Sequence, residues 1–132
     1  MKRKDLIELI LTKVQAEPVF EINKELISKK FRKTKNGIYF LYDENDIVIY
    51  VGEFGDGNYT SFYHRMYGHG SGAHCNKEWF YRTKKFRVKC FPMLVSDNIK
   101  KIERLMIYAN NQPAFNDCYV TEEQCDSIAR KL

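Results

Sequence analysis

Helical spacing of apolar residues marks both ends of the chain. Residues 5–15 carry apolar side chains three and four positions apart, and residues 22–33 repeat that spacing beyond Pro18. Near the C-terminus, the capping-box pattern Thr121-x-x-Gln124 predicts the start of a helix. The predicted helices cover residues 5–15, 22–33, about 60–68, about 97–110 and about 122–131.

Between these helices lie segments with the pattern of β-strands. Residues 37–42 and 47–53 are rich in β-branched and aromatic side chains, and a short polar break separates them, which predicts a hairpin. A third strand is predicted over residues 84–94, where apolar side chains for the core alternate with cations and Pro92 marks the end. The apolar set is Phe86, Val88 and Cys90, and the cationic set is Lys85, Arg87 and Lys89. Together these elements predict an α+β fold.

The register of the hairpin decides which side chains share a face. We expect Tyr42 to pair with Ile47 across the turn. In that register Tyr39 lies opposite Tyr50, with Cβ atoms about 5 Å apart. Such a pair either stabilises the sheet, as any aromatic pair does, or serves a site. The opposite face then belongs to the core, with Ile38, Phe40, Ile49 and Val51.

Length and charge limit the class of protein. A chain of 132 residues with 44% apolar residues suits one compact domain, here divided into a basic helical N-terminal extension over 1–35 and a main domain over 36–132. The formal net charge of +5 favours a polyanionic partner. Residues 77–104 hold nine bases and three acids, so either a nucleic-acid-binding face or a solvated basic surface is expected there.

The cysteines argue against a zinc ribbon or a redox motif, because none of them forms a C-x-x-C pair. They are Cys75, Cys90, Cys118 and Cys125. Free thiols in a reducing cytoplasm are the expected state, and a metal site that joins His74 and Cys75 to Cys90 or Cys118 is a minor alternative. Asp5 and Glu8 interrupt the apolar stretch that a signal peptide would need after the basic N-terminus, and no run reaches about 20 apolar residues, so neither a signal peptide nor a membrane span is expected.

One acidic residue stands inside an apolar helical stripe. In the predicted helix 97–110, Glu103 lies between Ile99 and Ile107, one turn away on either side. The stripe itself consists of Ile99, Ile102, Met106 and Ala109. A carboxylate on a buried face is costly unless a cation accompanies it. Either an internal salt bridge to an arginine or a metal ion would supply that cation.

Two tripeptides in the hairpin, Gly37-Ile38-Tyr39 and Tyr50-Val51-Gly52, resemble the signatures of the GIY-YIG nuclease family, with valine for the usual isoleucine. Further on, the pattern Tyr63-x-Arg65-Met66-x-x-x-His69 is similar to the family's arginine-bearing helix. Glu103 precedes an apolar run, as the family's glutamate does, although the following residues do not match the family's spacing literally. Gln112-Pro113-Ala114-Phe115-Asn116 resembles the closing Pro-x-aromatic-Asn. The resemblance extends from Gly37 to Asp117.

The resemblance implies a small central three-stranded antiparallel β-sheet flanked by helices, and metal-dependent hydrolysis of DNA. Glu103 would hold Mg²⁺, or Mn²⁺, and Arg65 would bind the scissile phosphate. Tyr39 or Tyr50 would activate the attacking water; since a phenol has a pKa near about 10, a helper such as His69 is expected. Asn116 would orient the site or tie its loop by hydrogen bonds. Phosphate contacts along the DNA are expected from Lys85, Arg87 and Lys89.

Several functions are compatible with these patterns. The leading hypothesis is an endonuclease. A restriction-like or mobile-element enzyme is the expected type, because no long DNA-recognition domain is appended. The second is a catalytically inactive nucleic-acid-binding module of the same fold. The third is a structural partner whose basic arm binds RNA or another protein. The intact set of site residues favours the enzyme, while DNA versus RNA and monomer versus homodimer stay open.

Overall fold

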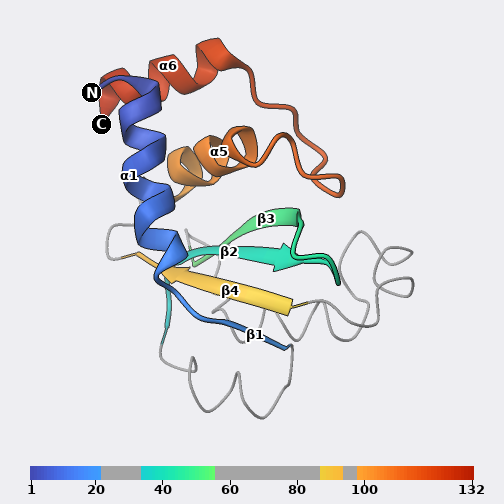
Figure 1. Cartoon of the computed structure of the whole chain (residues 1–132). Coiled ribbons are helices and arrows are strands. Elements are labelled where there is room, and N and C mark those ends of the chain that lie inside the picture. Colours follow the sequence, from blue (N-terminus) through green and yellow to red (C-terminus); the bar gives the residue numbers. More distant parts are fainter. Residues whose placement is uncertain (22–33, 56–86, 94–97) are drawn as a thin grey trace.

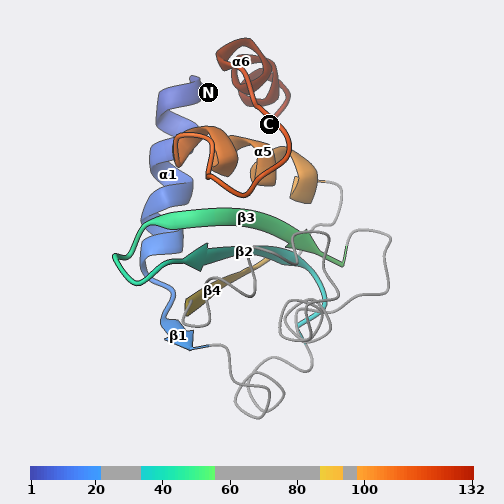
Figure 2. The ribbon, with the colours of Figure 1, turned by 90° about the vertical axis from the view of Figure 1, so that its right-hand side faces the viewer.

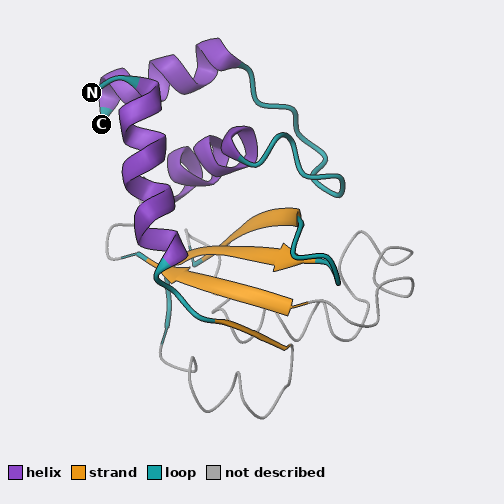
Figure 3. Cartoon of the chain, viewed as in Figure 1, coloured by secondary structure: helices purple, strands orange, loops and turns teal. Residues whose placement is uncertain are grey.

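Helices cover one face of an antiparallel sheet in the computed structural model, which describes residues 1–21, 34–55, 87–93 and 98–132 (Figure 1). Its elements are α1 (Arg3–Gln15), β1 (Val19–Glu21), β2 (Gly37–Tyr42), β3 (Val48–Phe54), β4 (Arg87–Pro92), α5 (Ile99–Ala109) and α6 (Glu122–Lys131). The strands lie in the order β1-β4-β2-β3. The predicted α+β class and the N-terminal helix are confirmed (Figure 3).

The helix bounds follow local signals in the sequence. Thr121 caps α6: its Oγ1 accepts from the backbone N–H of Gln124 at 3.2 Å, and Gln124 Oε1 accepts from the backbone N–H of Thr121 at 2.9 Å. The helices predicted over 22–33 and 60–68 lie outside the described residues. Within the described part of the chain, no helix combines the length and apolar character needed to cross a membrane.

The sheet has four strands rather than the three expected, because residues of the predicted N-terminal extension add β1 to its edge. Val19 pairs with Lys89, and Glu21 pairs with Arg87. With only three residues, β1 is too short for side-chain alternation to reveal it in the sequence. The described part of the extension therefore belongs to the same sheet as the hairpin.

The register of the hairpin differs from the predicted one by two residues. Tyr39 pairs with Gly52 and Leu41 pairs with Tyr50, because the turn closes between Asp43 and Ile47 rather than between Tyr42 and Ile47. The carboxylate of Asp43 accepts from the backbone N–H groups of Asn45 and Ile47, at 2.8 and 3.0 Å, which fixes this turn.

A bulge follows the turn, where the register shifts between Leu41 and Tyr42. A shift by an even number of residues keeps each side chain on its face, so both tyrosines still share one. The bulge, however, turns Ile49 onto that same face, beside Tyr39 and Leu41. The prediction that Ile49 lies with Ile38, Phe40 and Val51 is therefore wrong.

The main core lies between the helices and one face of the sheet, which we call the helix face (Figure 2). β2 contributes Ile38 and Phe40 and β3 contributes Val51. The helices contribute Leu6, Ile10 and Val14 from α1, Ile99, Ile102, Leu105, Met106 and Ile107 from α5, and Cys125, Ile128 and Ala129 from α6. The N-terminal helix is thus an integral part of this core.

The two ends of the chain are joined by one arginine. Arg3 on α1 forms ion pairs with Glu122 and Asp126 on α6, at 2.5 and 2.9 Å. Its guanidinium also lies 5.8 Å from the centre of the Tyr108 ring on α5. Figure 1 shows the N- and C-termini side by side as a result. Because the ion pairs are partly exposed, they orient α1 more than they stabilise it.

Substitutions on α1 test whether the extension is part of the core. Ile10→Ala should lower the free energy of unfolding by about 2–5 kcal/mol, because Ile10 is buried and its loss leaves a cavity. The matched control is Leu9→Ala on the same helix, where the side chain is 45% exposed and the expected loss is below about 1 kcal/mol. Urea unfolding measures both. Equal losses would contradict the packing of α1 described above.

Candidate functional site

The two motif tyrosines lie together on the face of the sheet opposite the helix face, which we call the tyrosine face. Tyr39 and Tyr50 are diagonal neighbours across β2 and β3, with ring centres 5.9 Å apart and ring planes tilted by 35°. Tyr39 is only 1% exposed, whereas Tyr50 is partly exposed. The convergence of the tyrosines is confirmed, although they are not directly opposite each other.

The glycine of the second motif makes room for the first tyrosine. A Cβ atom at Gly52 would overlap the hydroxyl and ring carbons of Tyr39. The phenol therefore lies directly over the backbone of β3, where only a glycine leaves space. Gly37 has a similar role, since a Cβ atom there would strike the carbonyl oxygen of Phe91 on β4. Both motif glycines permit close packing on the strands beside them.

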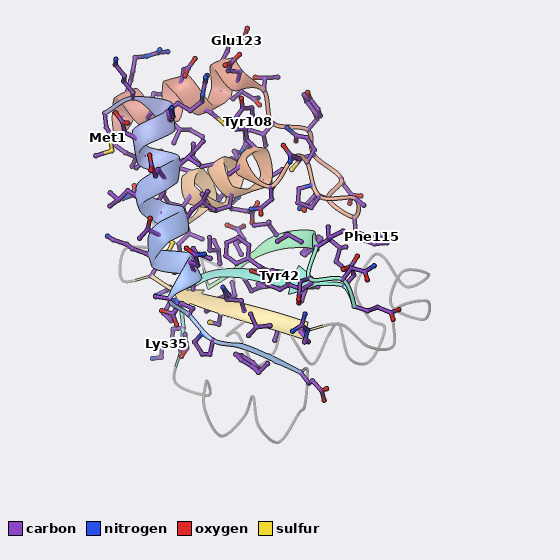
Figure 4. The ribbon with its side chains drawn as sticks, in the orientation of Figure 1. Met1, Lys35, Tyr42, Tyr108, Phe115 and Glu123 are labelled. Carbon is purple, nitrogen blue, oxygen red and sulfur yellow. The ribbon has the colours of Figure 1, made fainter. Side chains whose placement is uncertain are left out.

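Asn116 ties the loop between α5 and α6 to the free edge of β3. Its Oδ1 accepts from the backbone N–H of Val51 at 2.9 Å, and its Nδ2 donates to the carbonyl of Val51 at 2.8 Å. The backbone N–H of Phe115 donates to the carbonyl of Ile49 at 3.0 Å. Phe115 is labelled in Figure 4. The loop thus pairs with β3 much as a further strand would.

A second amide closes the same loop on itself. Gln112 Nε2 donates to the carbonyl of Val120 at 2.7 Å, and Gln112 Oε1 accepts from the backbone N–H of Val120 at 3.0 Å. Asn111 and Gln112 both have positive φ, 58° and 55°, which turns the chain sharply at the end of α5. The sequence pattern predicts no role for Gln112, because a hydrogen-bonded clamp between residues eight positions apart has no periodic signal.

Glu103 lies at the margin of the buried stripe of α5. Ile99 and Ile107, one turn before and after it, are fully buried, while Glu103 itself is partly exposed. Because α5 packs against β3 from the helix face, this carboxylate belongs to the element that covers the strand carrying Tyr50. The carboxylate is therefore half-shielded, which suits a group that binds a cation and still meets solvent.

Of the three cations predicted in a row on the third strand, the structure describes Arg87 and Lys89, and Lys89 is shielded from solvent. Lys89 pairs with Phe40, so its side chain points to the helix face, where it is 8% exposed and its amine lies 5.8 Å from the centre of the Tyr42 ring. Arg87 forms an ion pair with Asp46. Lys89 is therefore shielded on the helix face, although contact of the β4 cations with DNA phosphates stays a prediction.

The thiols do not form an alternative metal site in the described residues, which contain no group of three or more His, Cys, Asp or Glu residues able to hold an ion. Cys90 is buried, and burial raises the pKa of its thiol, with the nearby charge of Glu17 acting in the same direction. A thiol held in the protonated form is a poor metal ligand. His74 and Cys75 lie outside the described residues.

The described part of the site is therefore distributed around β3. Tyr39 and Tyr50 lie on the tyrosine face, Asn116 bonds the free edge of β3, and α5, which carries Glu103, packs from the helix face. The other predicted site residues, Arg65, His69 and Lys85, lie outside the described residues. Comparison of the chain with protein-family models, with curated proteins and with solved structures finds no match. What this site does must be inferred from its own residues.

Replacing Asn116 tests the connection between the loop and β3. Asn116→Ala removes two hydrogen bonds and should lower the free energy of unfolding by about 1–3 kcal/mol. Asn116→Asp should cost at least as much at neutral pH, because a carboxylate oxygen would face the carbonyl of Val51. Hydrogen exchange should become faster at the amide of Val51 in both variants.

The matched control is Asn45→Ala in the exposed hairpin turn, which should change neither quantity appreciably. Unchanged protection of the Val51 amide in Asn116→Ala would show that the loop is held to β3 by other contacts.

Proposed function

We propose that this protein is a divalent-metal-dependent endonuclease of the GIY-YIG type that hydrolyses DNA phosphodiester bonds. The observation that carries the proposal is the hydrogen-bonded pairing of Asn116 with Val51, 65 residues away in the chain. It brings the closing motif against the second tyrosine motif, while β2 brings the first motif to the same strand. Three separate sequence motifs thus meet at one strand, as a shared site requires.

Glu103 is the residue proposed to hold the metal, because its partly shielded carboxylate offers the oxygen ligand that Mg²⁺ or Mn²⁺ prefers. When bound, a divalent cation would neutralise charge that develops on the phosphate and on the leaving oxygen. One protein carboxylate is enough for such an ion, since water and the phosphate of the substrate supply further ligands. The absence of a larger acidic cluster among the described residues is compatible with this arrangement.

Tyr50 is the better candidate for the general base. Its side chain is partly exposed, so its phenolate oxygen can reach a water molecule, whereas Tyr39 is buried against Gly52. Tyr39 would then act as a positioning residue that holds the ring of Tyr50. A phenol serves as a base near neutral pH only if a cation or a proton acceptor is close by, and His69 is proposed as that acceptor.

The remaining roles concern the substrate. Arg65 is proposed to bind the scissile phosphate, because a guanidinium presents a planar fork of donors to two phosphate oxygens. Asn116 would keep its loop in place at the free edge of β3 without touching the phosphate. A single site cuts a single strand, so the first product expected from a plasmid is the nicked circle. A restriction-like or mobile-element role fits this chemistry best, and the cytoplasm is the proposed compartment.

Nicking of supercoiled plasmid by the purified chain tests the proposal. Nicked circles should accumulate with Mg²⁺ or Mn²⁺ and should be absent with EDTA. Glu103→Ala and Glu103→Gln should reduce the rate by at least about a hundredfold while salt-sensitive DNA binding persists. Tyr50→Phe should reduce it by about 10²–10⁴-fold, and Tyr39→Phe by less.

The matched control is Glu123→Gln on α6, an exposed carboxylate far from β3, which should cut at the wild-type rate (Figure 4). Cleavage that survives Glu103→Ala would contradict the assigned site. DNA binding without cleavage in either metal would instead identify a catalytically inactive binding module of the same fold.

A further inference from the structure

A hollow lies on the helix face, on the side of the sheet opposite Tyr39 and Tyr50, where α1 crosses the end of the hairpin. Its volume is about 350 Å³, within the range of small-molecule sites. The apolar lining consists of Leu11, Val14, Phe40, Tyr42 and Val48, and the polar lining consists of Gln15, Lys89 and Asn110. Residues of the extension and of the hairpin thus build it together.

Lys89 is the only charged side chain lining this hollow within the described residues. The side chain is 8% exposed, and its amine lies 5.8 Å from the centre of the Tyr42 ring (Tyr42 is labelled in Figure 4). Among the residues that the structure describes, the amine takes part in neither a hydrogen bond nor an ion pair. Burial lowers the pKa of Lys89, and the charge of Glu17 offsets this only in part.

A purely structural role does not account for this lysine well. A lysine that only covers apolar surface keeps its amine in water and buries its stem. Here only 8% of the residue is exposed and Lys89 lines the hollow, so partial desolvation of its charge opposes folding. A methionine of similar length would fill the space at no such cost. The charge of Glu17 and the ring of Tyr42 offset this cost only in part, and an anionic ligand in the hollow would offset more of it.

We propose that the hollow binds a small organic carboxylate, with the carboxylate paired to Lys89 and an apolar body packed among Val14, Phe40 and Val48. One cation balances one negative charge, whereas a phosphate dianion would leave a second charge against apolar walls. The volume suits a molecule of about ten heavy atoms. A nucleic-acid backbone is a poor fit, because it is polyanionic and lacks an apolar body to fill the walls.

The proposal does not depend on nuclease activity, and benzoate is a suitable probe. We expect benzoate to bind with a dissociation constant in the range of about 0.1–10 mM, since a ligand of this size has limited binding energy. Amide NMR shifts should move at Val14, Phe40 and Lys89. Benzamide, which has the same shape and no charge, should bind at least about tenfold more weakly, and inorganic phosphate should leave these shifts unchanged.

Lys89→Met separates the ion pair from the apolar contact. This variant should be at least as stable as the wild type in urea, because it removes a buried charge, and its affinity for benzoate should fall by at least about tenfold. Lys13→Met on the exposed side of α1 is the matched control and should bind benzoate normally.

Three results would overturn the proposal. They are the absence of shifts in the wild type with about 50 mM benzoate, which is about five times the weakest expected dissociation constant, equal affinity for benzamide, and undiminished benzoate binding by Lys89→Met. The comparison with benzamide uses only the wild-type chain, so it decides the question even if Lys89→Met folds poorly.

Discussion

The paired hydrogen bonds between the Asn116 side chain and the Val51 backbone connect the loop between α5 and α6 to the edge of the sheet. β3 is an edge strand, and such strands leave N–H and C=O groups open to other partners. The loop after α5 occupies part of that edge, and the Gln112–Val120 clamp holds the loop in shape. Because this loop joins α5 to α6, the same contact ties the chain after α5 to the edge of β3. Any chemistry shared by Glu103 and Tyr50 depends on it as well.

The two faces of the sheet carry different clusters of side chains. The helix face forms the main core with α1, α5 and α6, and the tyrosine face holds Tyr39 and Tyr50 in a second, smaller cluster. On the tyrosine face, the phenol of Tyr39 packs directly against the backbone of β3, because Gly52 has no Cβ atom. On the helix face, the one buried cation, among the residues the structure describes, is Lys89. The two motif tyrosines and the proposed carboxylate site therefore lie on opposite faces of β2, while Glu103 on α5 lies on the same side as the carboxylate site.

Local patterns predicted the helices and strands that have strong periodicity, such as α1, α6 and the hairpin. They did not predict the strand pairings and the burial that depend on residues distant in the sequence. β1 exists only because Val19 to Glu21 pair with β4, and Lys89 is buried because α1 covers its face. The predicted register was wrong for a different reason. The side chain of Asp43 sets a shorter turn, and the bulge at Ile49 shifts the pairing by one further residue. The order of the site motifs, by contrast, was visible in the sequence because each is a short contiguous run.

Paramagnetic broadening by Mn²⁺ tests the central claim most directly, because it locates a bound cation without relying on turnover. Amide signals around Glu103 on α5, around Tyr50 on β3 and around Asn116 should broaden first at substoichiometric Mn²⁺, and Glu103→Gln should abolish that effect. Signals of Glu122 and Asp126, which are engaged by Arg3, should stay sharp. Broadening centred on those residues or on the acidic hairpin turn, with the β3 edge unaffected, would contradict a metal-dependent catalytic centre at β3.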